Sequence, residues 1–306
     1  MSTAQIKNKS ASIRDKLYNL SKNSGIDFNN LIILYMQERI LYRLCQSSYY
    51  DKFVLKGGLL LFAHHGFYGR PTKDIDLLGM NISNDIDYIG KVFKEILSQN
   101  YRDGLSFSTD TIIIENIAED AKYPGVRVKV NCLLGNARNI MSIDIGFSDV
   151  ITPKPLKMQF PCILESEPAP EIYTYTKESI IAEKFHAMIK LGTLNSRMKD
   201  FCDIYMLSRK NDFEGAVLFE AIKETFEKRN TGFEKNPMVL SDEFKKNKDK
   251  KIQWTAFIKR ARLQDIPSDF EEVLLQVQRF ICPVYEKLLA GDDFIKSWNH
   301  EQNLWR

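Results

Sequence analysis

Three aspartates have the type and spacing needed to bind a divalent cation. Asp74 and Asp76 are separated by Ile75 alone, so on an extended strand both carboxylates point to one side and Ile75 to the other. Two carboxylates on one side of a strand repel each other unless a cation lies between them, and Mg²⁺ prefers oxygen ligands of this kind. Alternation in the segment 142–147 likewise leaves Asp144 projecting from the middle of an otherwise apolar strand. The pattern therefore predicts a site for Mg²⁺ (or Mn²⁺) formed by Asp74, Asp76 and Asp144.

Such a carboxylate set is suited to phosphoryl or nucleotidyl transfer from an NTP. Two divalent ions about 3.5–4 Å apart can clamp both the attacking and the leaving oxygen, and Asp144 would complete the set and take the acceptor's proton. Gly57 and Gly58 allow backbone N–H groups to approach a triphosphate, because no Cβ is in the way. Arg70, in the turn before the aspartates, is placed to offset negative charge. Each element alone is weak, since Asp-x-Asp also occurs on surface strands with solvated carboxylates and Gly-Gly usually marks a turn.

The elements around these residues read as a mixture of helices and strands. Apolar residues at helical spacing predict two helices within residues 1–50, with Gly25 ending the first and Asp27 capping the second. Arg39 and Arg43 share one face of the second helix. Solvated charge beside Glu38 is the favoured interpretation of this pair, and support of the site or a contact to phosphate is the alternative.

A sheet is predicted between residues 53 and 151. A short apolar segment that contains the two glycines is expected at 53–62, and a turn and a strand that ends near Gly79 follow it. Further strands are expected within 105–117, 126–135 and 140–151, and a helix capped by Ser83 or Asn84 is expected up to residue 97. Residues 126–131 alternate apolar and polar, as in a sheet with one buried face. Five prolines within 151–172 exclude a regular helix there and suggest a domain boundary. Later residues predict helices at 176–192, 195–210, 213–228, 254–263 and 270–289.

Length and composition limit the class of protein. The 306 residues suffice for roughly two domains, and we expect one at 1–165 and a helical one at 166–306. A net charge of +3 does not by itself indicate nucleic-acid binding. Five dispersed cysteines, a polar N-terminus and short apolar runs predict a cytoplasmic protein with reduced thiols and no membrane segment. The basic run at 245–251 has no interleaved aromatic residues and is interpreted as a solvated loop. The alternative is that this run, together with Arg127, Lys129 and Arg138, supplies phosphate contacts for RNA.

Five ordered motifs resemble one known family. They are FVLKGG at 53–58, RPTKDIDL at 70–77, SIDIGFSD at 142–149, IAEKFHA at 181–187 and NSRMKDFCDI at 195–204. Together they resemble the AbiEii/AbiGii family of nucleotidyltransferase toxins, which includes MenT-like toxins, over about residues 10–210. The resemblance implies an α+β fold: a DNA-polymerase-β-like nucleotidyltransferase core, with a mixed sheet flanked by helices, and a helical C-terminal domain. It also implies a bacterial toxin–antitoxin or phage-defence toxin that transfers nucleotides from an NTP, in the better understood branch to the acceptor end of tRNA.

The resemblance also assigns roles to residues at the matching positions. Gly57, Gly58, Asp74 and Asp76 correspond to the family's motif for metal and triphosphate, and Lys56 and Thr72 lie in the same two motifs. Lys184 corresponds to a lysine that meets nucleotide phosphates, and Asp200 to a catalytically required aspartate, with Arg197 and Lys199 beside it. From the sequence alone, Lys184 would be a solvated helix charge paired with Glu183, and Asp200 a capping or salt-bridged residue.

These observations together predict a Mg²⁺-dependent nucleotidyltransferase toxin. The acceptor is expected to be RNA, at the 3′ end of tRNA, and a cognate antitoxin is the expected protein partner. Two alternatives remain open at this point. One keeps the fold but transfers the nucleotide to a protein or small-molecule hydroxyl, and the other is a non-catalytic module that only binds an antitoxin.

Overall fold

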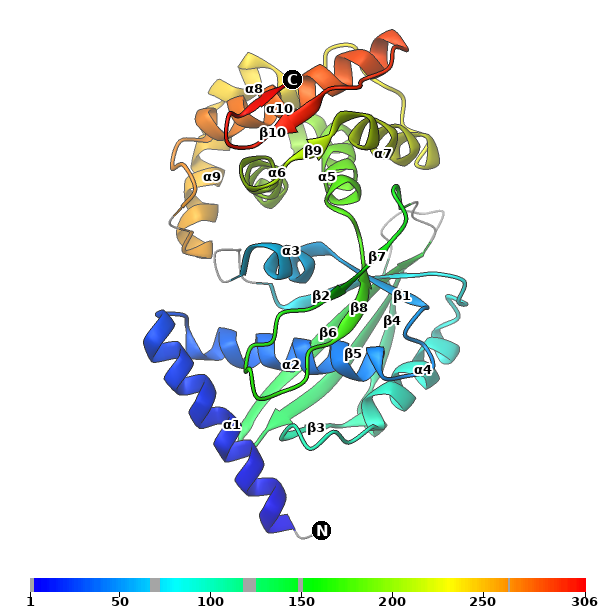
Figure 1. Ribbon diagram of the computed structural model, residues 1–306, viewed down its shortest axis with the longest axis vertical. Helices are drawn as coiled ribbons and strands as arrows, with labels where there is room; N and C mark the ends of the chain where they lie inside the picture. The colour runs from blue at the N-terminus through cyan, green and yellow to red at the C-terminus, as the bar shows by residue number, and fades with distance from the viewer. Residues whose placement is uncertain (1–2, 67–71, 118–124, 148–150, 264) are drawn as a thin grey trace. The chain divides into compact units, whose positions relative to one another are not determined.

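The chain folds into two compact units. The computed structural model describes residues 3–66, 72–117, 125–147, 151–263 and 265–306 (Figure 1). The N-terminal unit comprises Met1–Ser148 and Leu156–Thr174, and the C-terminal unit comprises Asp149–Pro155 and Tyr175–Arg306. The chain changes unit after residues 148, 155 and 174, whereas the sequence suggested a single division after 165. Residues 171–174 lie in the N-terminal unit because the strand Glu171–Thr174 pairs within its sheet.

The α-helices described in the N-terminal unit are α1 (Thr3–Ser24), α2 (Phe28–Cys45), α3 (Gly57–His65) and α4 (Ile86–Ser98). Asp27 caps α2 as expected, since its side chain accepts the Asn30 N–H at 3.1 Å. The cap of α4 is Asp85, whose carboxylate accepts the Tyr88 N–H at 2.8 Å. The expectation of Ser83 or Asn84 at this position was wrong, because the carboxylate of Asp85 is itself a strong N-cap acceptor.

Eight strands form one mixed sheet in the N-terminal unit. They are β1 (Phe53–Lys56), β2 (Asp74–Gly79), β3 (Leu105–Phe107), β4 (Ile113–Ile117), β5 (Gly125–Leu134), β6 (Ala137–Phe147), β7 (Leu156–Gln159) and β8 (Glu171–Thr174). The order is β3-β5-β6-β2-β1-β8-β7, and β4 also pairs with β5. The pairs β2–β6 and β1–β8 are parallel and the others antiparallel. The predicted class, a mixed sheet flanked by helices, is confirmed.

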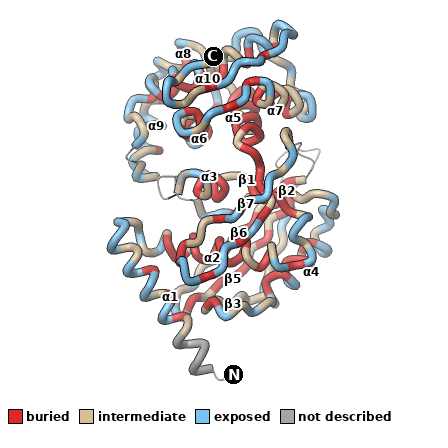
Figure 2. Tube along the Cα trace, in the orientation of Figure 1, coloured by how far each residue is buried: buried red, intermediate tan, exposed pale blue. Residues whose placement is uncertain are grey.

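The two faces of this sheet differ in polarity. One face carries buried apolar side chains that alternate along the strands, including Ile75, Val128 and Ile143. This face packs against α2 and α4, and the Phe53 and Phe93 rings lie 5.5 Å apart across the contact with α4. Figure 2 shows the buried stretches of α2 and of the central strands in red. The central strands present charged and polar side chains on the opposite face. This polar face is therefore the side of the sheet on which chemistry can occur.

Helix α2 contains buried ion pairs. Arg39 and Arg43 are each 1% exposed, so their interpretation as solvated charge was wrong. Arg43 donates two hydrogen bonds to the Asp103 carboxylate, at 2.6 and 3.1 Å, and Arg39 pairs with Glu38 and donates to the Pro168 carbonyl oxygen at 2.5 Å. These contacts tie α2 to two distant segments of the N-terminal unit. Sequence periodicity shows only that Arg39 and Arg43 share a helix face. It does not identify Asp103 and Pro168 as their partners, because these residues lie 60 and 129 positions away along the chain.

The C-terminal unit is mainly helical. Its helices are α5 (Lys177–Leu191), α6 (Met198–Lys210), α7 (Gly215–Lys228), α8 (Asp242–Lys246), α9 (Lys248–Ala261) and α10 (Phe270–Ala290). Short 3₁₀ helices lie at Thr109–Thr111 in the first unit and at Gly192–Leu194 and Met238–Leu240 in the second. A small antiparallel sheet of β9 (Phe213–Glu214), β10 (Ser297–Asn299) and β11 (Leu304–Trp305) was not expected from the sequence. It packs its tryptophans against Phe280 of α10.

The basic run at 245–251 is helical, which corrects its interpretation as a solvated loop. It spans the end of α8 and the start of α9, separated by Asn247, whose side chain caps α9. Lys250 within this run is 7% exposed.

In the described part of the chain, no helix combines the length and apolarity required to cross a membrane.

Candidate active site

A row of charged side chains crosses five strands on the polar face of the sheet. Strand register places Lys56 of β1 opposite Asp76 of β2. Asp76 in turn lies opposite Asp144 of β6, which lies opposite Arg127 of β5. Glu115 of β4 completes the row opposite Arg127. Residues opposite each other in a register share a face, so two neighbouring carboxylates are flanked by a cation on each side.

Asp144 is bound by Arg127 through both carboxylate oxygens. Arg127 Nε donates to Oδ1 at 2.7 Å and Nη2 donates to Oδ2 at 2.6 Å, a bidentate pair. The hydrogen bonds to Asp144 raise the pKa of Arg127, and Asp74 and Glu115 add to the effect by their negative charge. Ser142 also lies 3.4 Å from Asp144 through its hydroxyl. Arg127 therefore compensates the charge of Asp144, whose side chain is only 12% exposed.

Asp76 occupies the space that a side chain at Gly57 would need. Gly57 has φ +69°, and a Cβ added there would lie 2.5 Å from Asp76 Cγ and 2.7 Å from Asp76 Cβ. Only glycine fits such a close approach. Gly57 is also the first residue of α3, and Lys56 at the N-cap makes no capping hydrogen bond with its side chain. The Asp76 carboxylate therefore adjoins the N-terminus of α3, where N–H groups are available that have no acceptor within the helix.

The segment leading into β2 is held by α2. Gln37 is fully buried, and its Nε2 donates to the carbonyl oxygens of Thr72 and Asp74, at 3.5 and 3.4 Å. The Thr72 hydroxyl also donates to the Asp74 carbonyl, at 3.4 Å. These bonds fix the backbone at Asp74, whose side chain is exposed.

The other predicted residues of the N-terminal unit are placed as follows. Lys56 is 8% exposed at the end of β1, and Gly58 is buried in the first turn of α3. Arg70 lies outside the described residues. Arg127, Lys129 and Arg138, considered for RNA contacts, are engaged within the sheet, with Asp144, Glu115 and Asn131 respectively.

The C-terminal unit brings together four further charged residues. Lys184 of α5 lies with its Nζ 2.5 Å from Asp203 Oδ2 and 3.3 Å from Asp200 Oδ1. Arg197 Nε donates to the other oxygen of Asp200 at 2.7 Å. The Asp200 and Asp203 side chains are 0% and 2% exposed, whereas Arg197 is 48% exposed. Lys199 lies on the exposed side of α6.

The start of α6 is secured by a second buried lysine. Lys250 of α9 donates from Nζ to the Asn195 carbonyl oxygen at 2.7 Å, and burial lowers the pKa of Lys250. The Asn195 side chain accepts the Arg197 N–H at 2.8 Å. The loop that carries Arg197 toward Asp200 is thus anchored from α9, by a contact between residues 55 positions apart.

The carboxylates of the sheet provide the oxygen donors that Mg²⁺ or Mn²⁺ prefers, and Gly57 lets the Asp76 carboxylate lie against the start of α3. Among the described residues, however, no three His, Cys, Asp or Glu side chains are grouped closely enough to hold a metal ion. Both oxygens of Asp144 are engaged by Arg127, so Asp74 and Asp76 are the donors best fitted to bind a cation. The three-carboxylate site of Asp74, Asp76 and Asp144 stays a prediction.

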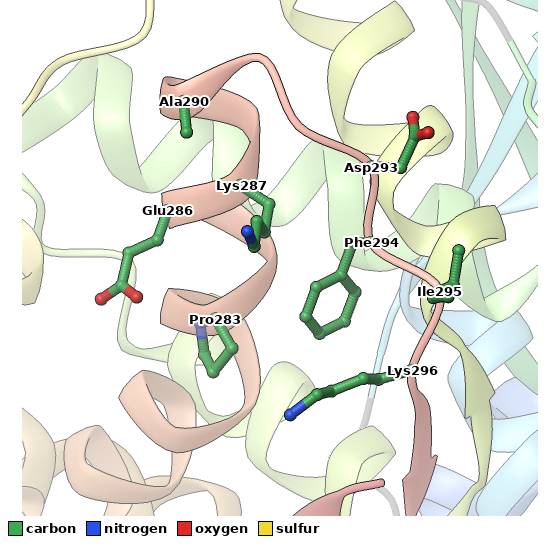
Figure 3. Close-up of a pocket in the computed structure, with 8 residues that line it drawn as sticks. All are labelled: Pro283, Glu286, Lys287, Ala290, Asp293, Phe294, Ile295 and Lys296. Carbon is green, nitrogen blue, oxygen red and sulfur yellow. The ribbon is translucent and has the colours of Figure 1, made fainter.

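A cavity of about 470 Å³ lies in the C-terminal unit between the end of α10 and the segment 293–296 (Figure 3). Its lining residues are Pro283, Glu286, Lys287, Ala290, Asp293, Phe294, Ile295 and Lys296. None of the residues singled out from the sequence is among them. The predicted site residues therefore lie outside this cavity.

Two functional candidates were not singled out as site residues from the sequence. Arg127 was considered only for RNA, although its place on the polar side of an alternating strand was visible. Asp203, the nearest carboxylate to Lys184, was visible as a residue three positions after Asp200 on the same helix face.

Comparison with known proteins identifies relatives of the chain. The family model described as "Nucleotidyl transferase AbiEii toxin, Type IV TA system" matches residues 39–276. Among curated proteins none matches. Two solved structures from Helicobacter pylori are similar over most of their length. One, an inferred nucleotidyltransferase, is 15% identical with a TM-score of 0.48, covering 88% of this chain and all of the other. The second, JHP933, is 14% identical with a TM-score of 0.47, covering 87% of this chain and 96% of the other.

Proposed function

The chain belongs to the family of AbiEii nucleotidyltransferase toxins, and on this premise we propose that it transfers a nucleoside monophosphate from an NTP to a hydroxyl of RNA. The 3′ end of tRNA is the proposed acceptor, the cytoplasm the proposed place of action, and a cognate antitoxin the proposed protein partner. The single observation that supports the site is the row of neighbouring carboxylates Asp76 and Asp144 flanked by Lys56 and Arg127.

In the proposed reaction, an acceptor hydroxyl oxygen bonds to the α-phosphorus of the NTP. The bond from that phosphorus to the β-phosphate oxygen breaks, pyrophosphate leaves with the electron pair, and the hydroxyl proton passes to a carboxylate of the row. Mg²⁺ or Mn²⁺, held by Asp74 and Asp76, would supply charge neutralisation at the reacting oxygens. The N–H groups at the start of α3, together with Lys56, are suited to the triphosphate.

The cluster of the C-terminal unit has a complementary role in this proposal. Lys184 and Arg197 are cations whose positions are fixed by buried carboxylates, as phosphate-binding groups need to be. Asp200 links the two, since each of its oxygens bonds to one cation. Lys199 is exposed and would contact only an outer part of the substrate.

A panel of the four labelled NTPs, each incubated with total RNA, tests the proposal. Wild-type protein is expected to label an RNA of tRNA size in the presence of Mg²⁺, and Asp76→Asn is expected to label none. If protein or a small molecule were labelled without RNA, the proposed RNA acceptor would be wrong but the nucleotidyltransferase activity would stand. Growth inhibition that persists in Asp76→Asn, with no labelling by either protein, would instead favour the binding-module alternative.

Replacing Arg127 by glutamine is expected to tighten metal binding several-fold. The substitution removes a positive charge and frees both oxygens of Asp144, which a divalent cation can then share with Asp76. Titration of free Mn²⁺ by electron paramagnetic resonance measures the affinity without any turnover.

Lys129→Gln is the matched control for this prediction. Lys129 lies on the same strand and face and pairs with Glu115 at 2.8 Å, so its loss removes the same charge without touching Asp144. If both variants changed the Mn²⁺ affinity equally, the change would come from the lost positive charge and not from the release of Asp144. Weaker binding in Arg127→Gln alone would show that Arg127 orients Asp144 as a ligand.

A further inference from the structure

Positive charge is concentrated on α9 and its C-cap. Residues 248–262 contain six Lys or Arg and a single carboxylate, Asp249. The whole chain has a net charge of only +3, so the other residues together are net negative. This distribution differs from that of a surface with evenly mixed charges.

Two of these six cations are engaged inside the protein. Lys250 is buried and bonded to Asn195, and Lys251 pairs with Glu271 at 2.9 Å. The remaining four, Lys248, Lys259, Arg260 and Arg262, are exposed. In the described part of the chain none of these four forms an ion pair, so their charge is directed outward.

The helix that carries the four cations is firmly seated. Trp254 is fully buried, donates from Nε1 to the Pro267 carbonyl oxygen at 3.0 Å, and packs against Phe270 at a ring distance of 5.7 Å. Lys248 and Arg260 are twelve residues apart, which on a helix corresponds to about 18 Å. Lys248 lies in the first turn of α9, and Lys259, Arg260 and Arg262 lie at its C-terminal end. The exposed cations are therefore held at both ends of a fixed helix, a span that matches several phosphates of one strand at about 3.4 Å of duplex axis per phosphate.

The chemistry of this face favours a polyphosphate chain over a protein. Ile252 is the one large apolar side chain of α9 that is more than half exposed, at 67%, and a protein interface needs a larger apolar centre. No aromatic ring of α9 is exposed for base stacking, because Trp254 and Phe257 are buried. Binding through charge alone does not depend on the base sequence of the nucleic acid.

We propose that Lys248, Lys259, Arg260 and Arg262 form a binding surface for the sugar-phosphate backbone of the acceptor RNA. This inference rests on the proposed function, since it assigns a second contact to the same substrate. The surface would hold RNA independently of base sequence and would leave the choice of the reacting end to other residues.

Reversing three of these charges tests the surface. The variant Lys248→Glu/Lys259→Glu/Arg260→Glu is expected to bind fluorescent tRNA about tenfold more weakly or worse, in anisotropy titrations between about 50 and 200 mM salt. The slope of log affinity against log salt is expected to fall by about 2, at about 0.7 for each lost contact. In the transfer assay the KM for RNA should rise, while the KM for NTP and the melting temperature should stay as in wild type.

The matched control is Lys91→Glu/Lys228→Glu/Lys235→Glu. These lysines are also exposed, form no ion pair in the described ranges and give the same change of net charge. The control should bind tRNA much more tightly than the α9 variant.

Each result of this comparison separates the surface from the function. If wild-type protein labels RNA while the α9 variant binds and labels it as the control does, the surface is refuted and the proposed function stands. If wild type neither binds nor labels RNA, the proposed acceptor fails and the surface with it. If the α9 variant keeps RNA binding but loses an acidic protein partner, the surface belongs to that partner and the RNA assignment is wrong.

Discussion

Replacing Gly57 by alanine is expected to lower the rate of nucleotide transfer by at least about 100-fold, the scale of a misplaced reacting group. The new Cβ would overlap the Asp76 carboxylate, and Asp76 cannot retreat without moving its own Cβ and strand β2. The φ of +69° adds a backbone penalty of about 1–3 kcal/mol, which a denaturant titration would measure. Transfer rates are compared per mole of folded protein.

Gly25→Ala separates the two parts of this effect. Gly25 has φ +72° and no atom within 4 Å of an added Cβ, so alanine there carries the same backbone penalty without any overlap. We expect it to lose a comparable free energy of unfolding and to keep its transfer rate. If Gly57→Ala transferred nucleotide as fast as Gly25→Ala, the close approach to Asp76 would have no catalytic importance.

Asp200→Asn is expected to abolish detectable transfer, again a loss above about 100-fold. The Asp200 side chain is fully buried and bonds to both Lys184 and Arg197, so the neutral amide would release Arg197 and leave Lys184 held by Asp203 alone of these two carboxylates. Removing one partner of a buried ion pair also destabilises a protein by about 3–5 kcal/mol. The measurements are the transfer rate and the free energy of unfolding.

Asp103→Asn is the control with the same chemical change. Asp103 is 1% exposed and accepts two hydrogen bonds from Arg43. Arg43 is not one of the candidate site residues. It should lose a similar stability and keep its rate per folded molecule. Equal rates in Asp200→Asn and Asp103→Asn would remove Asp200 from the site and leave it a purely structural residue.

Local sequence signals predicted most elements of the fold. Helical spacing placed α2, α4, α5 and α10, and alternation placed β2, β5 and β6, because each of these elements buries one face. Helix α3 was missed, since its apolar residues directly follow β1 and give no amphipathic pattern. The short strands β9 to β11 are too brief for a period to show.

The candidate site was predictable as a set of residues but not as a set of contacts. Residue type and the family resemblance selected Asp76, Asp144, Lys184 and Asp200. The pairing of Asp144 with Arg127 depends on strand register, which no local pattern encodes. The burial of Arg39 and Arg43 on α2 was likewise not predictable from local pattern. Their charge suggested a solvent-exposed position, and their partners lie in remote segments of the chain.

The charged row across the sheet also makes the site sensitive to how the strands align during folding. Asp76, Asp144 and Arg127 share a face only in the observed register, and a slip of β6 by one residue would turn Asp144 into the apolar side of the sheet. Burying that carboxylate among valines and isoleucines would cost several kcal/mol. A sheet with β6 misaligned would therefore be less stable, so the charged row also favours the correct strand register during assembly of the sheet.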